Sequence, residues 1–127
     1  MRLLNVFAAL SGAFALIMLV LVAHALQLAG PDADRMQLAA FIQLTAAAAA
    51  LAVAQRSGKL NLIAGAMILA GAAIFSSALY ALSLTQARSF AMLAPIGGMT
   101  LIAGWIALAF ARPRPHAELE APSSRPK

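Results

Sequence analysis

Three hydroxyl side chains, Ser76, Tyr80 and Ser83, recur at helical spacing within a long apolar stretch. Intervals of four and three residues place them on one face of a helix. Such a face can line a small polar cavity, or it can hydrogen-bond to neighbouring helices at about 0.6 kcal/mol per bond in membranes. We favour interhelical bonding. Gln43 and Thr100 are further candidates, and the sequence leaves open whether they face the same network.

His24 is the one ionisable side chain expected inside an apolar span. It can act as a proton relay or pH sensor, or it can be a neutral histidine bonded to a neighbouring helix, which we favour. The interiors of the expected spans contain no Asp, Glu, Lys or Arg, which argues against proton-coupled pumps and paired-carboxylate hydrolases. The chain has no cysteine, and His116 is expected on the opposite side of the membrane. We therefore predict no catalytic residue, no cofactor and no metal ligand.

The elements that position these residues are long apolar segments. Of the 127 residues, 63% are hydrophobic and 10% are charged, whereas soluble domains carry about 25% charged residues. Apolar runs of about 20 residues are long enough to cross the hydrocarbon layer as helices. Short polar breaks at residues 30–35, 55–59 and 85–89 divide the chain. The sequence therefore predicts an all-α integral membrane four-helix bundle, with spans at residues 3–28, 36–54, 60–84 and 90–111.

Several features refine these boundaries. Ala23-His24-Ala25 fits a signal-peptide cleavage site, but the preceding apolar run is longer than a typical signal sequence, so we expect a retained helix. Asp32 or Asp34 is expected to cap the second helix. Pro95 lies either in the first turn of the fourth helix or at a kink, and Gly97-Gly98 favours a bend or very close packing there. We predict a transmembrane domain over residues 1–111 and a disordered cytoplasmic tail over 112–127.

The distribution of basic residues predicts the orientation in the membrane. With four spans, the N-terminus, the second break and the tail lie on one side. That side carries seven basic residues, namely Arg2, Arg56, Lys59, Arg112, Arg114, Arg125 and Lys127. The other side carries two, Arg35 and Arg88. The positive-inside rule therefore predicts that both termini are cytoplasmic.

The third and fourth helices carry a recognisable pattern. The segments Phe75-Ser76-Ser77-Ala78-Leu79-Tyr80, Ala94-Pro95-Ile96-Gly97-Gly98 and Ala103-Gly104-Trp105 resemble the family called domain of unknown function 423. The similarity implies a small bacterial membrane protein of about four helices, and it implies no established activity. The chain departs from the family pattern in the second helix, where Ile42 and Ala46 stand in place of a tyrosine and a histidine.

From these observations we predict a non-enzymatic structural or interaction protein of the bacterial cytoplasmic membrane. Lipid is its first partner, and we expect a homo-oligomer or a larger membrane complex. The alternative is a carrier or channel for a small neutral or lipid-like solute, built on the hydroxyl face and the bend at Pro95, Gly97 and Gly98. A nucleic-acid partner is not expected. The nine basic residues are scattered and do not form a stripe with aromatic residues.

Overall fold

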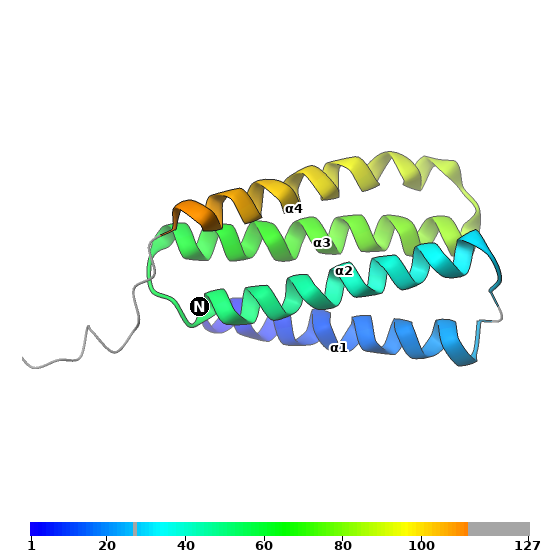
Figure 1. The fold of residues 1–127 in the computed structure, drawn as a ribbon, viewed down its shortest axis with the longest axis horizontal. Coiled ribbons are helices and arrows are strands. Elements are labelled where there is room, and N and C mark those ends of the chain that lie inside the picture. The colour runs from blue at the N-terminus through cyan, green and yellow to red at the C-terminus, as the bar shows by residue number, and fades with distance from the viewer. Residues whose placement is uncertain (27, 112–127) are drawn as a thin grey trace, which may run out of the picture.

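The computed structural model describes residues 1–26 and 28–111, and this part of the chain consists of helices joined by short links, without strands (Figure 1). Four helices in it are long and apolar enough to cross a membrane, when η1 and α4 are taken as one segment. The all-α fold with four membrane-spanning helices is therefore confirmed. The elements are α1 (Arg2–His24), α2 (Pro31–Ala54), α3 (Lys59–Thr85), the 3-10 helix η1 (Arg88–Met92) and α4 (Leu93–Phe110).

The four helices lie side by side in an open row, and each runs antiparallel to the one before it (Figure 1). α2 packs between α1 and α3, while no Cα atom of α4 comes within 8 Å of a Cα atom in α1 or α2. Within the most apolar stretch of each span, α2 and α3 each have 44% of their residues buried. The corresponding share is 22% for α1 and 11% for the segment that contains α4. The two outer helices thus present most of their side chains to the surroundings.

Small side chains allow α2 to occupy its central place in the row. Ala46, Ala47 and Ala50 are buried, and a Cβ added at Gly12 of α1 would lie 3.4 Å from the Cβ of Ala47. Because lipid is as apolar as leucine, membrane helices associate through close packing and polar contacts, which small residues permit. The alanine run of α2 therefore serves packing on two sides.

The link between α1 and α2 differs from the predicted one. α1 ends at His24, before the expected Leu28, because the Leu21 carbonyl accepts hydrogen bonds from the N–H groups of both Ala25 and Leu26 at 2.9 Å. α2 begins at Pro31 instead of residue 36. The predicted polar turn is thus the first turn of the helix, where proline needs no N–H partner.

The expected side-chain cap on α2 is also absent. Gly30 occupies the N-cap position with a φ of 60°, and no side chain caps the helix. Asp32 and Asp34 lie inside the first turn, where negative charge interacts favourably with the positive end of the helix dipole. They therefore support the start of α2 electrostatically and do not cap it.

The fourth span begins with a different kind of helix. η1 covers Arg88–Met92 as a 3-10 helix, and the α-helix follows from Leu93. Pro95 is the third residue of α4 and so lies in its first turn, the first of the two arrangements that the sequence allowed. The predicted disordered tail lies outside the described residues, and the predicted domain boundary at residue 111 stays a prediction.

Glycine brings α3 and α4 into very close contact. A Cβ added at Gly71 would lie 2.4 Å from the backbone nitrogen of Leu101, and one added at Gly97 would lie 2.4 Å from that of Phe75. At Gly104 the nearest atom would be the backbone nitrogen of Ile68, at 2.8 Å. Real Cβ atoms do not approach backbone this closely, so each position requires glycine as the chain is packed. The α3/α4 contact is made backbone against backbone.

Candidate functional site

Three polar side chains from three different helices form a hydrogen-bonded chain inside the row. The Tyr80 hydroxyl of α3 donates to Oε1 of Gln43 on α2 at 3.0 Å, and Nε2 of Gln43 donates to Oγ of Ser11 on α1 at 3.1 Å. Gln43 is 6% exposed and lies near the middle of α2. We call Ser11, Gln43 and Tyr80 the polar chain. It links the three helices where water is scarce and hydrogen bonds between side chains matter most.

Two further contacts fix the polar chain in place. Ser76, one turn before Tyr80, is fully buried, and its hydroxyl donates to the Ala39 carbonyl of α2 at 2.8 Å. The ring of Phe14 on α1 meets the ring of Tyr80 edge to face, with the ring centroids 6.0 Å apart. This is a favourable aromatic geometry. The side chains around Gln43 are therefore held by both polar and aromatic contacts.

A groove runs between α1 and α3 on one side of α2. Its volume is about 700 Å³, and its walls are the apolar side chains of α1 and α3. Gln43 is the one α2 residue that lines it, and Ser11 lines it from α1. A smaller hollow continues the groove past Phe14 to Tyr80 and Ser77. The lining residues of the groove are Leu4, Phe7, Leu10, Ser11, Phe14, Gln43, Leu62, Ala66, Leu69, Ala70 and Ala73.

The structure brings together only some of the predicted polar residues. Gln43, Ser76 and Tyr80 all bond between helices. Ser83 is buried, but its hydroxyl oxygen has no partner among the described residues. Thr100 bonds to the Ile96 carbonyl of its own helix and does not reach the polar chain. The predicted hydroxyl face therefore divides: its first two members bond to α2, and Ser83 does not.

His24 lies apart from this group. It is exposed at the end of α1 and has no hydrogen bond to another side chain among the described residues. The part of the chain described by the structure holds no cluster of three or more His, Cys, Asp or Glu residues that would suit a metal ion. The neutral histidine bonded to a neighbouring helix stays a prediction.

The predicted bend at Pro95, Gly97 and Gly98 coincides with the tight contact between α3 and α4. Gly97 faces α3 and is buried, whereas a Cβ added at Gly98 would meet a ring carbon of Phe75 at an ordinary 3.8 Å. Pro95 and Gly98 line a hollow of about 430 Å³ beside Phe75. Of the two expectations for this segment, very close packing is the one that these distances describe.

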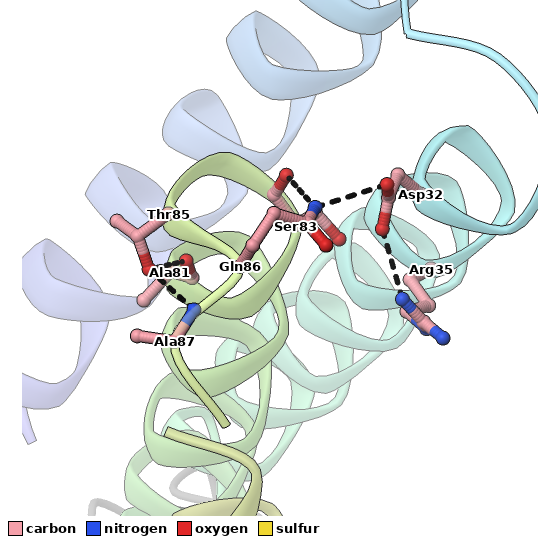
Figure 2. A network of polar contacts seen from close by, with 7 residues as sticks. All are labelled: Asp32, Arg35, Ala81, Ser83, Thr85, Gln86 and Ala87. Atoms are coloured by element: carbon pink, nitrogen blue, oxygen red, sulfur yellow. Dashed lines mark hydrogen bonds and ion pairs between the residues drawn. The ribbon is translucent and has the colours of Figure 1, made fainter. Parts of the chain in front are cut away.

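A second polar network ties α2 to α3 at the end of the molecule that holds the α1/α2 link (Figure 2). Nε2 of Gln86 donates to Oδ2 of Asp32 at 3.0 Å and to the Ser83 carbonyl at 3.0 Å. Arg35 donates to the other carboxylate oxygen of Asp32 at 2.8 Å. Gln86 adopts the left-handed conformation at the end of α3, with a φ of 57°. This turn directs its side chain towards α2.

Sequence reasoning missed Ser11 and the contact between Asp32 and Gln86. Ser11 is the one hydroxyl residue in the first apolar run, and this isolation could have identified it as a candidate for interhelical bonding. The Asp32–Gln86 bond joins residues 54 positions apart, and no local pattern indicates such a pairing. Its existence depends on how the helix ends meet in space.

The sequence of this chain is similar to those of bacterial membrane proteins. Residues 10–98 match the family described as "Protein of unknown function (DUF423)". A UPF0382 membrane protein of Staphylococcus haemolyticus is 47% identical over 45 residues, which are 35% of this chain and 37% of the relative. A UPF0382 membrane protein of Staphylococcus aureus is 48% identical over 48 residues, which are 38% of this chain and 39% of the relative. The matched segments thus span well under half the length of these relatives. No solved structure matches the chain.

Proposed function

This chain belongs to the DUF423 family of proteins of unknown function, and we propose that it is a non-enzymatic assembly protein of the bacterial cytoplasmic membrane. In this role it associates with further copies of itself or with a larger membrane complex. The observation that carries the proposal is the use of its interior polar groups. Ser76, Tyr80 and Gln43 bond from helix to helix, which is the pattern of a structural core.

The shape of the row supports the same proposal. α4 has backbone contacts with α3 and η1 and none with α1 or α2, so its outward face is free for association. That face carries exposed apolar side chains such as Ile102, Trp105 and Ile106. Lipid covers such a surface without cost, so association there depends on packing and not on a hydrophobic driving force.

The proposal includes an orientation with both termini in the cytoplasm. The start of α1 and the link between α2 and α3 lie at the same end of the row (Figure 1). These segments carry Arg2, Arg56 and Lys59. Arg35 and Arg88 lie at the other end, where Asp32 and Asp34 offset part of their charge. Reporter fusions after Lys127 and after Asp32 test this orientation. A signal at Lys127 from a reporter that works only outside the cytoplasm contradicts this orientation.

Affinity purification from gently solubilised membranes tests the assembly role. We expect a tagged chain to retain an untagged copy, or a fixed set of other membrane proteins, in constant proportion. Chemical cross-linking in intact membranes before solubilisation checks that the association precedes extraction. A chain that stays monomeric in both experiments, with no partner in constant proportion, overturns the proposal.

A carrier for a small neutral or lipid-like solute is the second candidate. The groove of about 700 Å³ between α1 and α3 favours it, because a solute could lie there beside polar atoms. Under this alternative, Tyr80→Phe and Ser76→Ala abolish solute flux into vesicles. Under the assembly proposal, the same substitutions cause only a modest loss of stability.

A further inference from the structure

We infer that the groove between α1 and α3 binds one neutral molecule with an apolar chain and a carbonyl group, such as a ketone, an ester or a quinone. The carbonyl oxygen lies at the polar chain, and the apolar chain lies along the groove walls. This inference is independent of the proposed assembly role, because it concerns a site within a single copy of the protein.

The polar chain holds more hydrogen-bond donors than it uses. Ser11, Gln43 and Tyr80 carry four donor hydrogens, and the two bonds within the polar chain use two of them. Exchanging the amide oxygen and nitrogen of Gln43 changes which donors are used, but two donors still remain. No other side-chain bond of these residues exists in the described part of the chain. The polar chain therefore has surplus donors and calls for an acceptor.

The donors of Gln43 and Ser11 lie far from both ends of their helices. Gln43 lies near the middle of the 24-residue α2, and Ser11 near the middle of the 23-residue α1. In the centre of a bilayer there is no water to accept from an unused N–H or O–H group, and leaving one unpaired is costly. A ligand acceptor at this depth removes the cost. A carbonyl oxygen is suited to the task because it accepts without bringing a donor or a charge.

The groove is long and apolar. From Phe14 its walls follow α1 down to Leu4 and α3 down to Leu62. Ten residues of helix span about 15 Å, so the groove extends from the polar chain towards the end with the basic residues. The walls are apolar, and Ala66 and Ala70 leave room between the larger side chains. The groove therefore fits an apolar chain that carries a polar group at its end deep in the membrane.

The same depth distinguishes the ligand from an ordinary phospholipid. The ester carbonyls of phospholipids lie near the interface, about 15 Å from the bilayer centre, given a hydrocarbon core of about 30 Å. An acyl chain in the groove would fill the walls but would bring no acceptor to Gln43. We therefore assign the ligand of the groove as a neutral carbonyl compound dissolved in the hydrocarbon.

The test uses the full chain in nanodiscs and a long-chain methyl ketone labelled with ¹³C at its carbonyl. We expect the infrared carbonyl band of the bound ketone to shift to lower frequency, as hydrogen bonding requires. Gln43→Leu removes the amide donor, so it should reduce the shift and weaken binding about tenfold, which corresponds to the loss of about 1.4 kcal/mol. Ser76→Ala is the matched control, because its bond to Ala39 lies outside the groove, and it should leave both the shift and the affinity unchanged.

A second variant tests the groove without altering the polar chain. Ala70 is exposed at the groove wall, so Ala70→Phe should fill the space, leave the fold intact and abolish ketone binding. The inference is overturned if the wild type, Gln43→Leu and Ala70→Phe bind the ketone with equal affinity and its carbonyl band is unshifted in all three. A shift of the phospholipid ester band in place of the ketone band also overturns it.

The groove can also be tested for occupation by another copy of the chain. Because the chain has no cysteine, Ala66→Cys introduces a single thiol at the groove. We expect no disulfide between copies when membranes are oxidised. An efficient intermolecular disulfide at this position shows that a second copy fills the groove, which overturns the ligand assignment. Ketone binding to the monomeric protein remains measurable even if the proposed assembly role fails.

Discussion

The two interfaces on either side of α3 hold their neighbouring helices by opposite means. Towards α4, Gly71, Gly97 and Gly104 bring backbone against backbone. Towards α2, α3 offers Ser76 and Tyr80, whose hydroxyls donate to Ala39 and Gln43 of that helix. The glycine contact leaves no space for a side chain, whereas the groove lies between α1 and α3, which α2 separates. The α3/α4 interface is thus held by backbone contact, and the α2/α3 interface also uses side-chain hydrogen bonds.

The difference has a physical origin in the membrane. Without a hydrophobic driving force between helices, attraction comes from van der Waals contact or from hydrogen bonds. Glycine maximises the first because its backbone can approach closely. Gln43 and Tyr80 supply the second, with side chains that need space. The following predictions test whether stability depends mainly on the glycine contact, and whether the polar interface contributes smaller and separable amounts.

The largest effect is expected at Gly97. Alanine favours helix by about 1 kcal/mol over glycine. At Gly97, however, its Cβ would lie 2.4 Å from the backbone nitrogen of Phe75. Overpacking against backbone outweighs the propensity gain, so Gly97→Ala should lose about 3 kcal/mol of unfolding free energy. Gly98→Ala is the control, because its Cβ meets only ordinary contact, and it should be neutral or stabilising. Denaturation by SDS in mixed micelles measures both, and equal losses would contradict the glycine interface.

Gln43→Leu should have the second-largest effect. It removes both bonds of the polar chain and leaves the Tyr80 hydroxyl without its acceptor, for a loss of about 1–2 kcal/mol. A double-mutant cycle with Tyr80→Phe sharpens the test. The double variant should lose less than the sum of the single variants, because it leaves no unpaired hydroxyl at position 80. Strict additivity in the same SDS titration argues against a Gln43–Tyr80 bond.

Ser76→Ala is expected to have a smaller effect. Its hydroxyl donates to the Ala39 carbonyl, a bond of about 0.6 kcal/mol in membranes. The neighbouring Ser77→Ala is a matched control, because Ser77 bonds to carbonyls of its own helix and is exposed. Unfolding of the two variants in parallel should show a loss for Ser76→Ala and no change for Ser77→Ala. The reverse order would mean that Ser76 does not hold α3 to α2.

The smallest effect is expected at the end of the row. Asp32→Ala removes a partly exposed ion pair with Arg35 and a bond from Gln86, and it should lose about 0.5 kcal/mol (Figure 2). Asp32→Asn keeps an oxygen that can accept from Gln86 and should lose less. A loss at Asp32 as large as that at Gly97, measured under the same conditions, would show that this end network governs stability.

Much of the architecture was readable from the residues alone. The low charge content and the spacing of polar breaks predicted four helices, and α3 begins and ends within one residue of its predicted bounds. The ends of the segments were harder to predict, since Pro31 begins a helix where a turn was expected. Hydropathy averages over many residues and places a span well, whereas a helix end depends on a few local bonds.

For the candidate site, the sequence by itself determined the polar residue types and their spacing along each helix. Intervals of four and three put Ser76 and Tyr80 on one face because a helix has a fixed period. Only the tertiary structure decided that Ser11 and Gln43 complete the polar chain, that Thr100 does not join it, and that Gly97 meets the backbone of α3. These outcomes depend on the rotation and distance of each helix relative to its neighbours. Those quantities are set by packing between segments distant in the chain and not by the period of any one segment.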